Sequence, residues 1–260
     1  MSERFQGQHF VVTGAGTGIG RAIAQRLASE GAVLSLMARR EAPLAETAEL
    51  IVAAGGAQPG CLAVDIRDQG VVDAAFERAT AERGPLSGLV ANAGVGGPNA
   101  PGEDDRFADL VATNLSGTYH CARAAERHLT PGPETRNLVL ISSVLGRIGV
   151  AGYTGYCASK TGVIGLARAL AMELAPKHVQ VNAVCPGWVD TAMAREGLEG
   201  MAQAMQISFE EAHQIAMQAV PAGRMSTPEE VAGMVAYLLS PDAQGVTGQA
   251  LDQNGGAFML

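Results

Sequence analysis

Short apolar runs alternate with longer stretches of helical periodicity through most of this 260-residue chain. The runs have the composition of buried strands, and they are His9–Thr13, Val33–Met37, Cys61–Val64, Ser87–Ala91, Asn137–Ser142 and Val179–Val184. The stretches between them predict helices at about Gly18–Glu30, Ala42–Ala54, Gln69–Arg83, Phe107–Leu129 and Tyr156–Leu174. Strands that alternate with helices form β-α-β units, whose strands are parallel. The alternation therefore predicts an α/β fold with a parallel sheet covered by helices on both faces.

The composition excludes several classes of protein. Hydrophobic residues make up 47% of the chain, enough to bury a core, so a mainly disordered chain is excluded. Acidic residues outnumber basic ones by 26 to 18, and the net charge of −8 argues against bulk binding of nucleic acid or of an anionic membrane surface. No apolar run is long enough to predict a membrane span. Without an internal repeat or a linker, residues 1–260 are expected to form one domain.

The cysteines and histidines predict neither a disulfide framework nor a metal site. Cys61, Cys121, Cys157 and Cys185 lie far apart and form no C-x-x-C pair, which is typical of reduced thiols in a cytoplasmic protein. The five histidines are scattered without metal-ligand spacing. The segment Met1–Phe5 lacks the apolar stretch of a signal peptide. We therefore expect a cytoplasmic protein without a bound metal.

A glycine-rich turn follows the first predicted strand and opens the first predicted helix. Glycine lets the backbone turn tightly and approach a pyrophosphate closely, and the N-terminus of the helix presents free N–H groups to that anion. The turn reads T-G-x-x-x-G-x-G from Thr13 to Gly20, in the strand–turn–helix context that a phosphate site requires. The predicted contacts to the cofactor phosphates are Gly14, Thr17, Gly18, Ile19 and Gly20.

The spacing of these glycines resembles that of the short-chain dehydrogenase/reductase family, and the resemblance covers nearly the whole chain. The segment Asn92-Ala93-Gly94, after the fourth predicted strand, looks like the N-A-G motif of the family, which stabilises the central sheet. Asp65 matches the residue that hydrogen-bonds the adenine amino group in family members. The resemblance implies a single-domain, Rossmann-like, doubly wound parallel sheet of about seven strands.

The same resemblance places further residues beside a dinucleotide. The pair Pro186-Gly187 matches the turn beside the nicotinamide, and Thr191 matches the hydroxyl that contacts the carboxamide. The remaining cofactor contacts implied by the resemblance are Ile66, Asn92, Ala93, Gly94, Val189, Tyr156 and Lys160.

The end of the second predicted strand distinguishes NADP from NAD. An acidic residue there would bind the ribose hydroxyls of NAD and repel the 2′-phosphate of NADP. By the family resemblance, NAD-dependent members carry Asp at the position of Ala38. In this chain Arg39 and Arg40 follow Ala38. Arg39 can form charge-assisted bonds to a 2′-phosphate. The segment favours NADP over NAD, although two solvated surface arginines would give the same sequence.

Tyr156 and Lys160 stand four residues apart, so they share one face of a helix, and Ser143 ends the preceding predicted strand. Reduction of a carbonyl needs a proton donor at its oxygen, and a free tyrosine has a pKa of about 10. Lowering that pKa by about three units requires about 4 kcal/mol of stabilisation of the phenolate. A lysine ammonium and a positive nicotinamide can supply it.

The family resemblance assigns roles to the neighbours of Tyr156. It implies that Lys160 holds the ribose hydroxyls, that Ser143 orients and polarises the substrate oxygen, and that Asn114 binds a water joining Lys160 to solvent. A purely structural hydrogen bond is the alternative for Asn114. We expect Ser142 to face the backbone and Tyr153 to line the substrate pocket.

The regular alternation is lost at about residues 190–226, where family members have a mobile lid over the substrate. This stretch holds five of the ten methionines, which suits an adaptable apolar pocket, although helices packing on the core would also explain them. Its five carboxylates against two arginines argue modestly against docking of an acidic acyl carrier protein.

The sequence thus predicts an oxidoreductase that transfers hydride between NADP(H) and a ketone or secondary alcohol, with Tyr156 as general acid and base. A small ketone, a cyclic alcohol or an acyl thioester would fit, because the lid is similar to those of polyketide ketoreductases and 3-oxoacyl reductases. The alternatives are an NAD-dependent hydroxyacyl-thioester dehydrogenase and a non-catalytic dinucleotide-sensing regulatory protein. The resemblance suggests a homotetramer built on Phe107–Leu129 and Tyr156–Leu174, or else a dimer.

Overall fold

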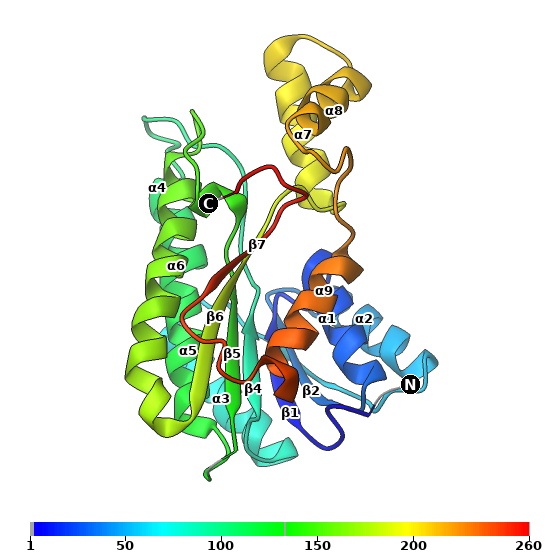
Figure 1. Cartoon of the computed structure of the whole chain (residues 1–260), viewed down its shortest axis with the longest axis vertical. Helices are drawn as coiled ribbons and strands as arrows, with labels where there is room; N and C mark the ends of the chain where they lie inside the picture. The colour runs from blue at the N-terminus through cyan, green and yellow to red at the C-terminus, as the bar shows by residue number, and fades with distance from the viewer. Residues whose placement is uncertain (1–2, 133, 260) are drawn as a thin grey trace.

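The computed structural model describes residues 3–132 and 134–259. Its centre is an all-parallel sheet in the order β3-β2-β1-β4-β5-β6-β7, seen nearly edge-on in Figure 1. The strands are β1 His9–Thr13, β2 Val33–Ala38, β3 Gly60–Ala63, β4 Gly88–Ala91, β5 Arg136–Ile141, β6 Val179–Pro186 and β7 Ala250–Gln253. The predicted doubly wound α/β fold is confirmed.

Helices cover both faces of this sheet, and two hydrophobic clusters fill the space between. The helices are α1 Gly18–Ser29, α2 Glu41–Ala53, α3 Gln69–Arg83, α4 Phe107–Val111, α5 Gly117–His128, α6 Thr154–Leu174, α7 Ala192–Met205, α8 Phe209–Gln218 and α9 Pro228–Leu239. One cluster joins α3, α5 and α6 to the sheet, and the other joins α1, α2 and α9 to its opposite face. Along β5, Leu138 and Leu140 belong to the first cluster, whereas Val139 and Ile141 belong to the second, as the two-residue period of a strand requires.

The strand β1 pairs with β2 on one side and with β4 on the other. Strands β2 and β3 therefore extend the sheet in one direction from β1, and the later strands extend it in the other. The glycine turn follows β1 and the Asn92 segment follows β4, so both lie at the carboxyl edge of the sheet, at its topological switch point. In open α/β sheets this crevice is where ligands bind.

The predicted helix Phe107–Leu129 is interrupted in the structure. It consists of α4, a π-helical turn over Ala112–Ser116, and α5. The apolar face expected for a straight helix is correspondingly incomplete: Leu110 is fully buried, whereas Phe107 is 43% exposed. A π-helical turn inserts one residue into the helical repeat and rotates the residues before it relative to those after it.

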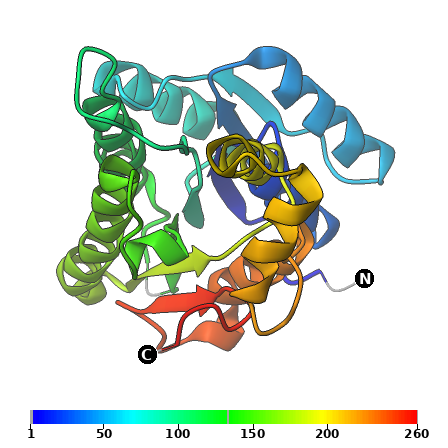
Figure 2. The same cartoon turned by 90° about the horizontal axis from the view of Figure 1, so that it is seen from above.

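The predicted departure from alternation after Asp190 corresponds to α7 and α8, which rise beyond the carboxyl edge of the sheet (Figure 1). Seen from above, they stand over that edge, and the chain returns from them to α9 (Figure 2). Among the described residues, no helix could cross a membrane and no cluster of potential ligands could hold a metal ion.

Candidate active site

The turn after β1 has a backbone that only glycine adopts easily. Gly14 and Gly18 have φ angles of +65° and +52°, in the left-handed region that other residues rarely enter. A Cβ atom on Gly20 would lie 2.2 Å from the carbonyl oxygen of Gly14. The three glycines singled out in the sequence are therefore required by the shape of this turn.

Two side chains bind carbonyl groups of the turn. Thr47 donates to the carbonyl oxygen of Ala15 at 3.0 Å, and Arg21 donates to that of Gly16 at 2.6 Å. Within the described chain, the Thr17 side chain makes no capping hydrogen bond to α1. The first N–H groups of α1, from Gly18 onward, are thus left to bind an anion.

Asn92 joins the ends of β4 and β1. Its amide nitrogen donates to the carbonyl oxygens of Thr13 at 3.0 Å and Gly14 at 3.2 Å. The Thr13 hydroxyl accepts from the N–H groups of Asn92 and Ala93, both at 3.0 Å. The Asn92 side chain is therefore occupied in fixing the base of the crevice.

The far end of the crevice carries a pair of arginines at the end of β2. Arg39 and Arg40 are exposed, and neither forms an ion pair with any described residue. Asp65 has a partner within the chain, because Arg67 forms a bidentate ion pair with its carboxylate, with a shortest distance of 2.6 Å. The hydrogen bonds from Arg67 hold the pKa of Asp65 below its usual range. An adenine amino group at Asp65 would share the carboxylate with Arg67.

Three further predicted cofactor contacts, Ile66, Ala93 and Gly94, pack against neighbouring backbone. Ala93 lies against the glycine turn, since a Cβ atom on Gly14 would lie 2.8 Å from its Cα. Ile66 is 5% exposed and packs where a Cβ atom on Gly117 would lie, 2.6 Å from its Cδ1. A Cβ atom on Gly94 would lie 3.0 Å from Asn114 Oδ1 and 3.4 Å from Lys160 Nζ. The absence of a side chain at Gly94 therefore leaves Asn114 and Lys160 close to the same part of the backbone.

The catalytic candidates lie on β5 and the first turns of α6. Ser143 follows β5 in an extended conformation, and its hydroxyl accepts from the Leu145 N–H at 3.1 Å. Lys160 is 4% exposed, and its Nζ lies 5.8 Å from the centre of the Tyr156 ring. Lys160 Nζ also donates to the carbonyl oxygen of Ile141 at 2.9 Å. Ser142 faces the backbone, donating to the Lys160 carbonyl oxygen at 2.8 Å.

Burial shifts the two titrating groups in opposite directions. It lowers the pKa of Lys160 from 10.5 to about 8, because removal from water disfavours the ammonium. It raises the pKa of Tyr156 above 10, and the neighbouring Ser143 hydroxyl lowers that pKa in part. Burial thus favours the protonated form of Tyr156, and the Ser143 hydroxyl opposes part of this effect.

Asn114 is fully buried in the π-helical turn. Its amide accepts from the N–H of Val95 at 2.8 Å and donates to the carbonyl oxygen of Val95 at 3.0 Å and to the Ser159 hydroxyl at 3.1 Å. Its side chain therefore fixes the loop after Gly94 to α6.

The segment after β6 connects the site to α7. Gly187 packs so tightly that a Cβ atom on it would lie 2.9 Å from Cα of Asn254. Thr191 caps α7: its hydroxyl accepts from the Ala194 N–H at 3.3 Å and donates to the Val189 carbonyl oxygen at 3.2 Å. A Cβ atom on Gly18 would lie 3.1 Å from the Thr191 methyl group, so the glycine turn and the start of α7 face each other. Pro186, the last residue of β6, precedes this segment.

Comparisons with known proteins agree with this geometry. A family model described as enoyl-(acyl carrier protein) reductase matches residues 14–257. A putative ketoacyl reductase of the monensin polyketide synthase from Streptomyces virginiae is 40% identical over 252 residues, covering 95% of each chain. A 3-oxoacyl-[acyl-carrier-protein] reductase from Escherichia coli is 35% identical over 258 residues, covering 98% of this chain and 99% of its own.

The solved structures include a variant of actinorhodin polyketide ketoreductase crystallised with NADPH, with a TM-score of 0.90, 38% identity and 99% of both chains covered. Levodione reductase has a TM-score of 0.89 and 30% identity, with 97% of this chain and 98% of its own covered. The chain belongs to the short-chain dehydrogenase/reductase family. Within that family it is an NAD(P)-dependent ketoreductase.

A dinucleotide cofactor of this family fits the crevice. The N-terminus of α1 offers N–H groups to phosphates, and the turn before it is formed by Gly14 and Gly18, both with positive φ angles. Lys160 lies at one end of the crevice, and Arg39 lies at the other, after β2. The donors suit the phosphates and ribose hydroxyls of such a molecule.

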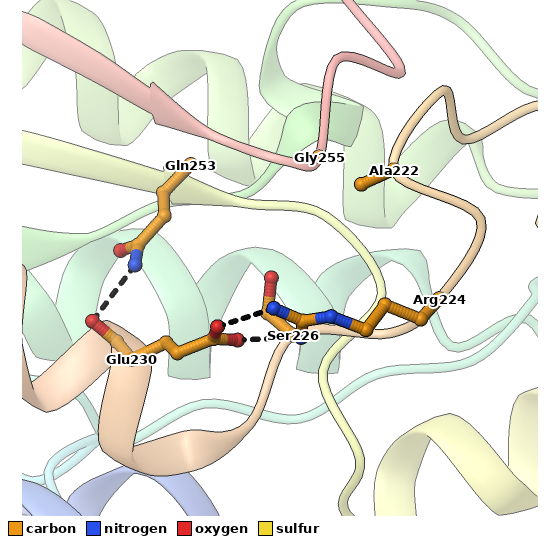
Figure 3. A pocket seen from close by; sticks show the side chains of 6 residues that line it. All are labelled: Ala222, Arg224, Ser226, Glu230, Gln253 and Gly255. Atoms are coloured by element: carbon orange, nitrogen blue, oxygen red, sulfur yellow. Dashed lines mark hydrogen bonds and ion pairs between the residues drawn. The ribbon is translucent and has the colours of Figure 1, made fainter.

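The segment that contains α7 and α8 has its own small hydrophobic cluster, formed by Leu198, Ala216, Met217 and Val220 with Trp188, Met225 and Ala257 packed against it. At the base of the segment, Val189 pairs with Ser226 in an isolated bridge. A cavity of about 380 Å³ lies here, lined by Ala222, Arg224, Ser226, Glu230, Gln253 and Gly255 (Figure 3). Arg224 forms an ion pair with Glu230 at 2.6 Å across it.

Sequence reasoning missed two groups that surround the site. Arg147, just after the Ser143 turn, forms an ion pair with Asp252 of β7 at 3.0 Å. Asn99, in the loop after Gly94, binds the first turn of α6. Their partners lie 105 and 56 residues away in the sequence, so no local pattern signals them.

Proposed function

We propose that this ketoreductase reduces a ketone to a secondary alcohol with NADPH, and that Ser143, Tyr156 and Lys160 perform the chemistry. The observation that carries the proposal is the convergence of these three side chains at the end of β5, beside a crevice built for a dinucleotide. Lys160 lies 5.8 Å from the Tyr156 ring centre, and the Ser143 hydroxyl acts directly on the pKa of Tyr156.

In this mechanism the bound cofactor supplies a hydride to the carbonyl carbon. Tyr156 gives its proton to the carbonyl oxygen, and Ser143 donates a hydrogen bond to the same oxygen. Lys160 is mostly protonated at neutral pH, since its pKa is about 8, and its ammonium stabilises the tyrosinate that is left. Asn114 donates a hydrogen bond to Ser159 of α6, the residue before Lys160, and so helps to fix the position of Lys160.

NADPH is the cofactor that the adenine end favours. Arg39 and Arg40 are exposed there without described ion-pair partners, and Ala38 offers no carboxylate to repel a 2′-phosphate. A structural relative that was crystallised with NADPH supports the same choice. An NAD-dependent hydroxyacyl-thioester dehydrogenase is the alternative that the cofactor experiment below tests.

Ketoacyl groups are the substrate class we propose, with residues 190–226 closing over them as a lid on a single catalytic domain. The ketoacyl reductases among the relatives support this class. We also propose a homotetramer built on α4, α5 and α6, which is supported by exposed apolar side chains on these helices: Phe107, Tyr119 and Met172.

Substitution of Tyr156 tests the chemistry. Tyr156→Phe should reduce turnover at least about a hundredfold, the lower scale of general acid–base catalysis, while NADPH still binds because the glycine turn and Lys160 are unchanged. Tyr237→Phe, at an exposed tyrosine of α9, is the matched control and should retain turnover within about twofold. Turnover, followed by NADPH absorbance at 340 nm, and NADPH binding, followed by fluorescence, are measured together. Normal turnover in Tyr156→Phe would refute the assignment, and NADPH binding without turnover of any ketone by the unmodified protein would favour a dinucleotide sensor.

Substitution of Arg39 tests the cofactor. Arg39→Ala should weaken NADPH binding by about 1.5–3 kcal/mol, the contribution of a hydrogen bond to a charged group. NADH has no 2′-phosphate, so its Kd should stay nearly constant. Adding Ala38→Asp should widen the change, because the new carboxylate repels a phosphate. Equal changes in the Kd of NADPH and NADH would show that Arg39 contacts no part specific to NADPH.

A further inference from the structure

The loop between β4 and α4, residues 95–106, lies at the start of two helices. Within the described chain, neither helix is capped by the side chain of its own N-cap residue, which is Arg106 for α4 and Tyr153 for α6. An uncapped helix start leaves several N–H groups without partners. Both helices receive their caps from this loop instead.

Asn99 supplies the cap of α6. Its side chain is almost fully buried, with 9% of the residue exposed. The Oδ1 atom accepts from the Gly155 N–H at 2.8 Å and from the Thr154 hydroxyl at 3.2 Å. The Asn99 N–H donates to the Gly152 carbonyl oxygen at 2.8 Å. One residue thus binds three of the four residues that immediately precede Tyr156.

Asp105 connects this cap to α4. Asn99 Nδ2 donates to Asp105 Oδ1 at 2.9 Å, and the same oxygen accepts from the Phe107 N–H at 2.9 Å. The two helix starts are also in close contact, because a Cβ atom on Gly155 would lie 3.0 Å from the Leu110 side chain. The Asn99–Asp105 hydrogen bond therefore fixes the first turn of α6 relative to α4.

The same loop also touches the proposed lid. A Cβ atom on Gly96 would lie 2.9 Å from the sulfur of Met193 in α7. The loop is thus placed between α7 on one side and the first turn of α6 on the other, with Asn99 as its link to α6.

We propose that Asn99 is a positioning residue, which fixes the Tyr156 hydroxyl for proton transfer through its hydrogen bonds to the first turn of α6. The inference rests on the proposed function, in which Tyr156 is the proton donor. Asn99 itself touches neither substrate nor cofactor in this role. A small displacement of a catalytic group lowers turnover strongly, about a hundredfold for about 1 Å.

Exchange of the two side chains tests this role. Asn99→Asp alone puts two carboxylates face to face and should lower kcat about tenfold to a hundredfold. The exchange Asn99→Asp with Asp105→Asn provides a carboxylate for Gly155 and an amide donor opposite it, and should restore kcat to within about threefold of the unmodified enzyme. Asp105→Asn alone retains an acceptor for Asn99 and should change kcat less than about threefold. The Kd of NADPH should stay within about twofold in all three variants.

Asn99→Ala covers the case in which Asn99→Asp does not fold, since it removes the cap without adding a charge. It should lower kcat about tenfold, with folding followed by circular dichroism. A folded Asn99→Ala variant with unchanged kcat would overturn the proposal. So would an exchange variant that folds and binds NADPH but recovers no more kcat than Asn99→Asp.

Variants on a Tyr156→Phe background separate this inference from the proposed function. With the proton donor removed, Asn99→Ala should lower the residual turnover by less than about twofold. Full activity of Tyr156→Phe would instead refute the proposed function. A tenfold further loss from Asn99→Ala on that background would leave Tyr156 as the donor and overturn the positioning role.

Discussion

Ser143, Tyr156 and Lys160 lie where α6 packs against β5, β6 and α4. By contrast, α7 and α8 pack mainly against each other. Around the Ser143 turn, Thr161 donates to the Gly146 carbonyl oxygen at 3.1 Å and Ser142 donates to that of Lys160 at 2.8 Å. In the proposed function this difference matches two tasks, since proton transfer needs fixed geometry and substrate entry needs a segment that opens at low cost.

The ion pairs of the two regions show the same contrast. Arg147 binds Asp252 of β7, and the two side chains are only 8% and 21% exposed. Arg224 binds Glu230 at the exit of α8 toward α9, and these side chains are 59% and 39% exposed. Charges removed from water interact far more strongly than charges at the surface. The Ser143 turn is thus held to the edge strand β7 by a largely buried ion pair, whereas the proposed lid is held to α9 by an exposed one.

The largest effect we predict comes from the buried lysine of the catalytic region. Lys160 carries a proton below its pKa of about 8 and loses it as the pH rises above that value. Burial raises the pKa of Tyr156 from its ordinary value, which favours the protonated form, so the loss of activity should follow the titration of Lys160. The kcat/KM for ketone reduction should therefore fall about tenfold per pH unit above 8, about a hundredfold by pH 10. A profile that stays level to pH 10 would contradict this role of Lys160.

The next effect compares the two ion pairs directly. Arg147→Met leaves the Asp252 carboxylate without its partner and should lower the free energy of unfolding by about 3 kcal/mol, the lower end of the range for breaking a buried pair. It should also lower kcat, because the Ser143 turn loses its attachment to β7. Urea denaturation of both Arg147→Met and Arg224→Met gives the comparison. Arg224→Met, at an exposed pair, should leave the unfolding midpoint nearly unchanged, and equal losses in the two variants would remove the distinction.

The sequence predicted six of the seven strands because each contains a short apolar run. Five of these strands are almost entirely buried, whereas β3 alternates buried and exposed residues. Sequence patterns gave no signal for β7, whose four residues are all only half-buried and include Asp252 and Gln253. The π-helical turn was also missed, because apolar spacing cannot distinguish one inserted residue within a long helix. A half-buried strand without an apolar run and a local change of helical pitch both depend on tertiary packing, which local sequence patterns do not contain.

Within the site, local spacing predicted what lies within one turn or one helix. The four-residue step from Tyr156 to Lys160 and the glycine spacing after β1 are of this kind. The capture of Asp65 by Arg67 was not predicted, although the two residues are neighbours, because either could equally have faced a ligand. Asn99 and Arg147 act on partners far along the chain, so only the fold reveals them.

The smallest effect we predict is in the hydrophobic cluster of the lid. Leu198 of α7 is fully buried there, as Leu170 of α6 is nearly fully buried in the main core. Leu170→Ala should lower the free energy of unfolding by about 2–5 kcal/mol, the usual cost of such a cavity. Leu198→Ala removes the same atoms, but from a segment that opens locally.

The loss of packing at Leu198 should therefore act on the equilibrium between closed and open lid rather than on global unfolding. We expect KM for the ketone to rise about twofold to tenfold, kcat to stay within about twofold, and the urea midpoint to change little. Steady-state kinetics and urea denaturation of Leu198→Ala and Leu170→Ala, measured side by side, check this. If Leu198→Ala lowered the urea midpoint as much as Leu170→Ala, the lid would unfold together with the core, and its cluster would belong to the same cooperative unit as the catalytic region.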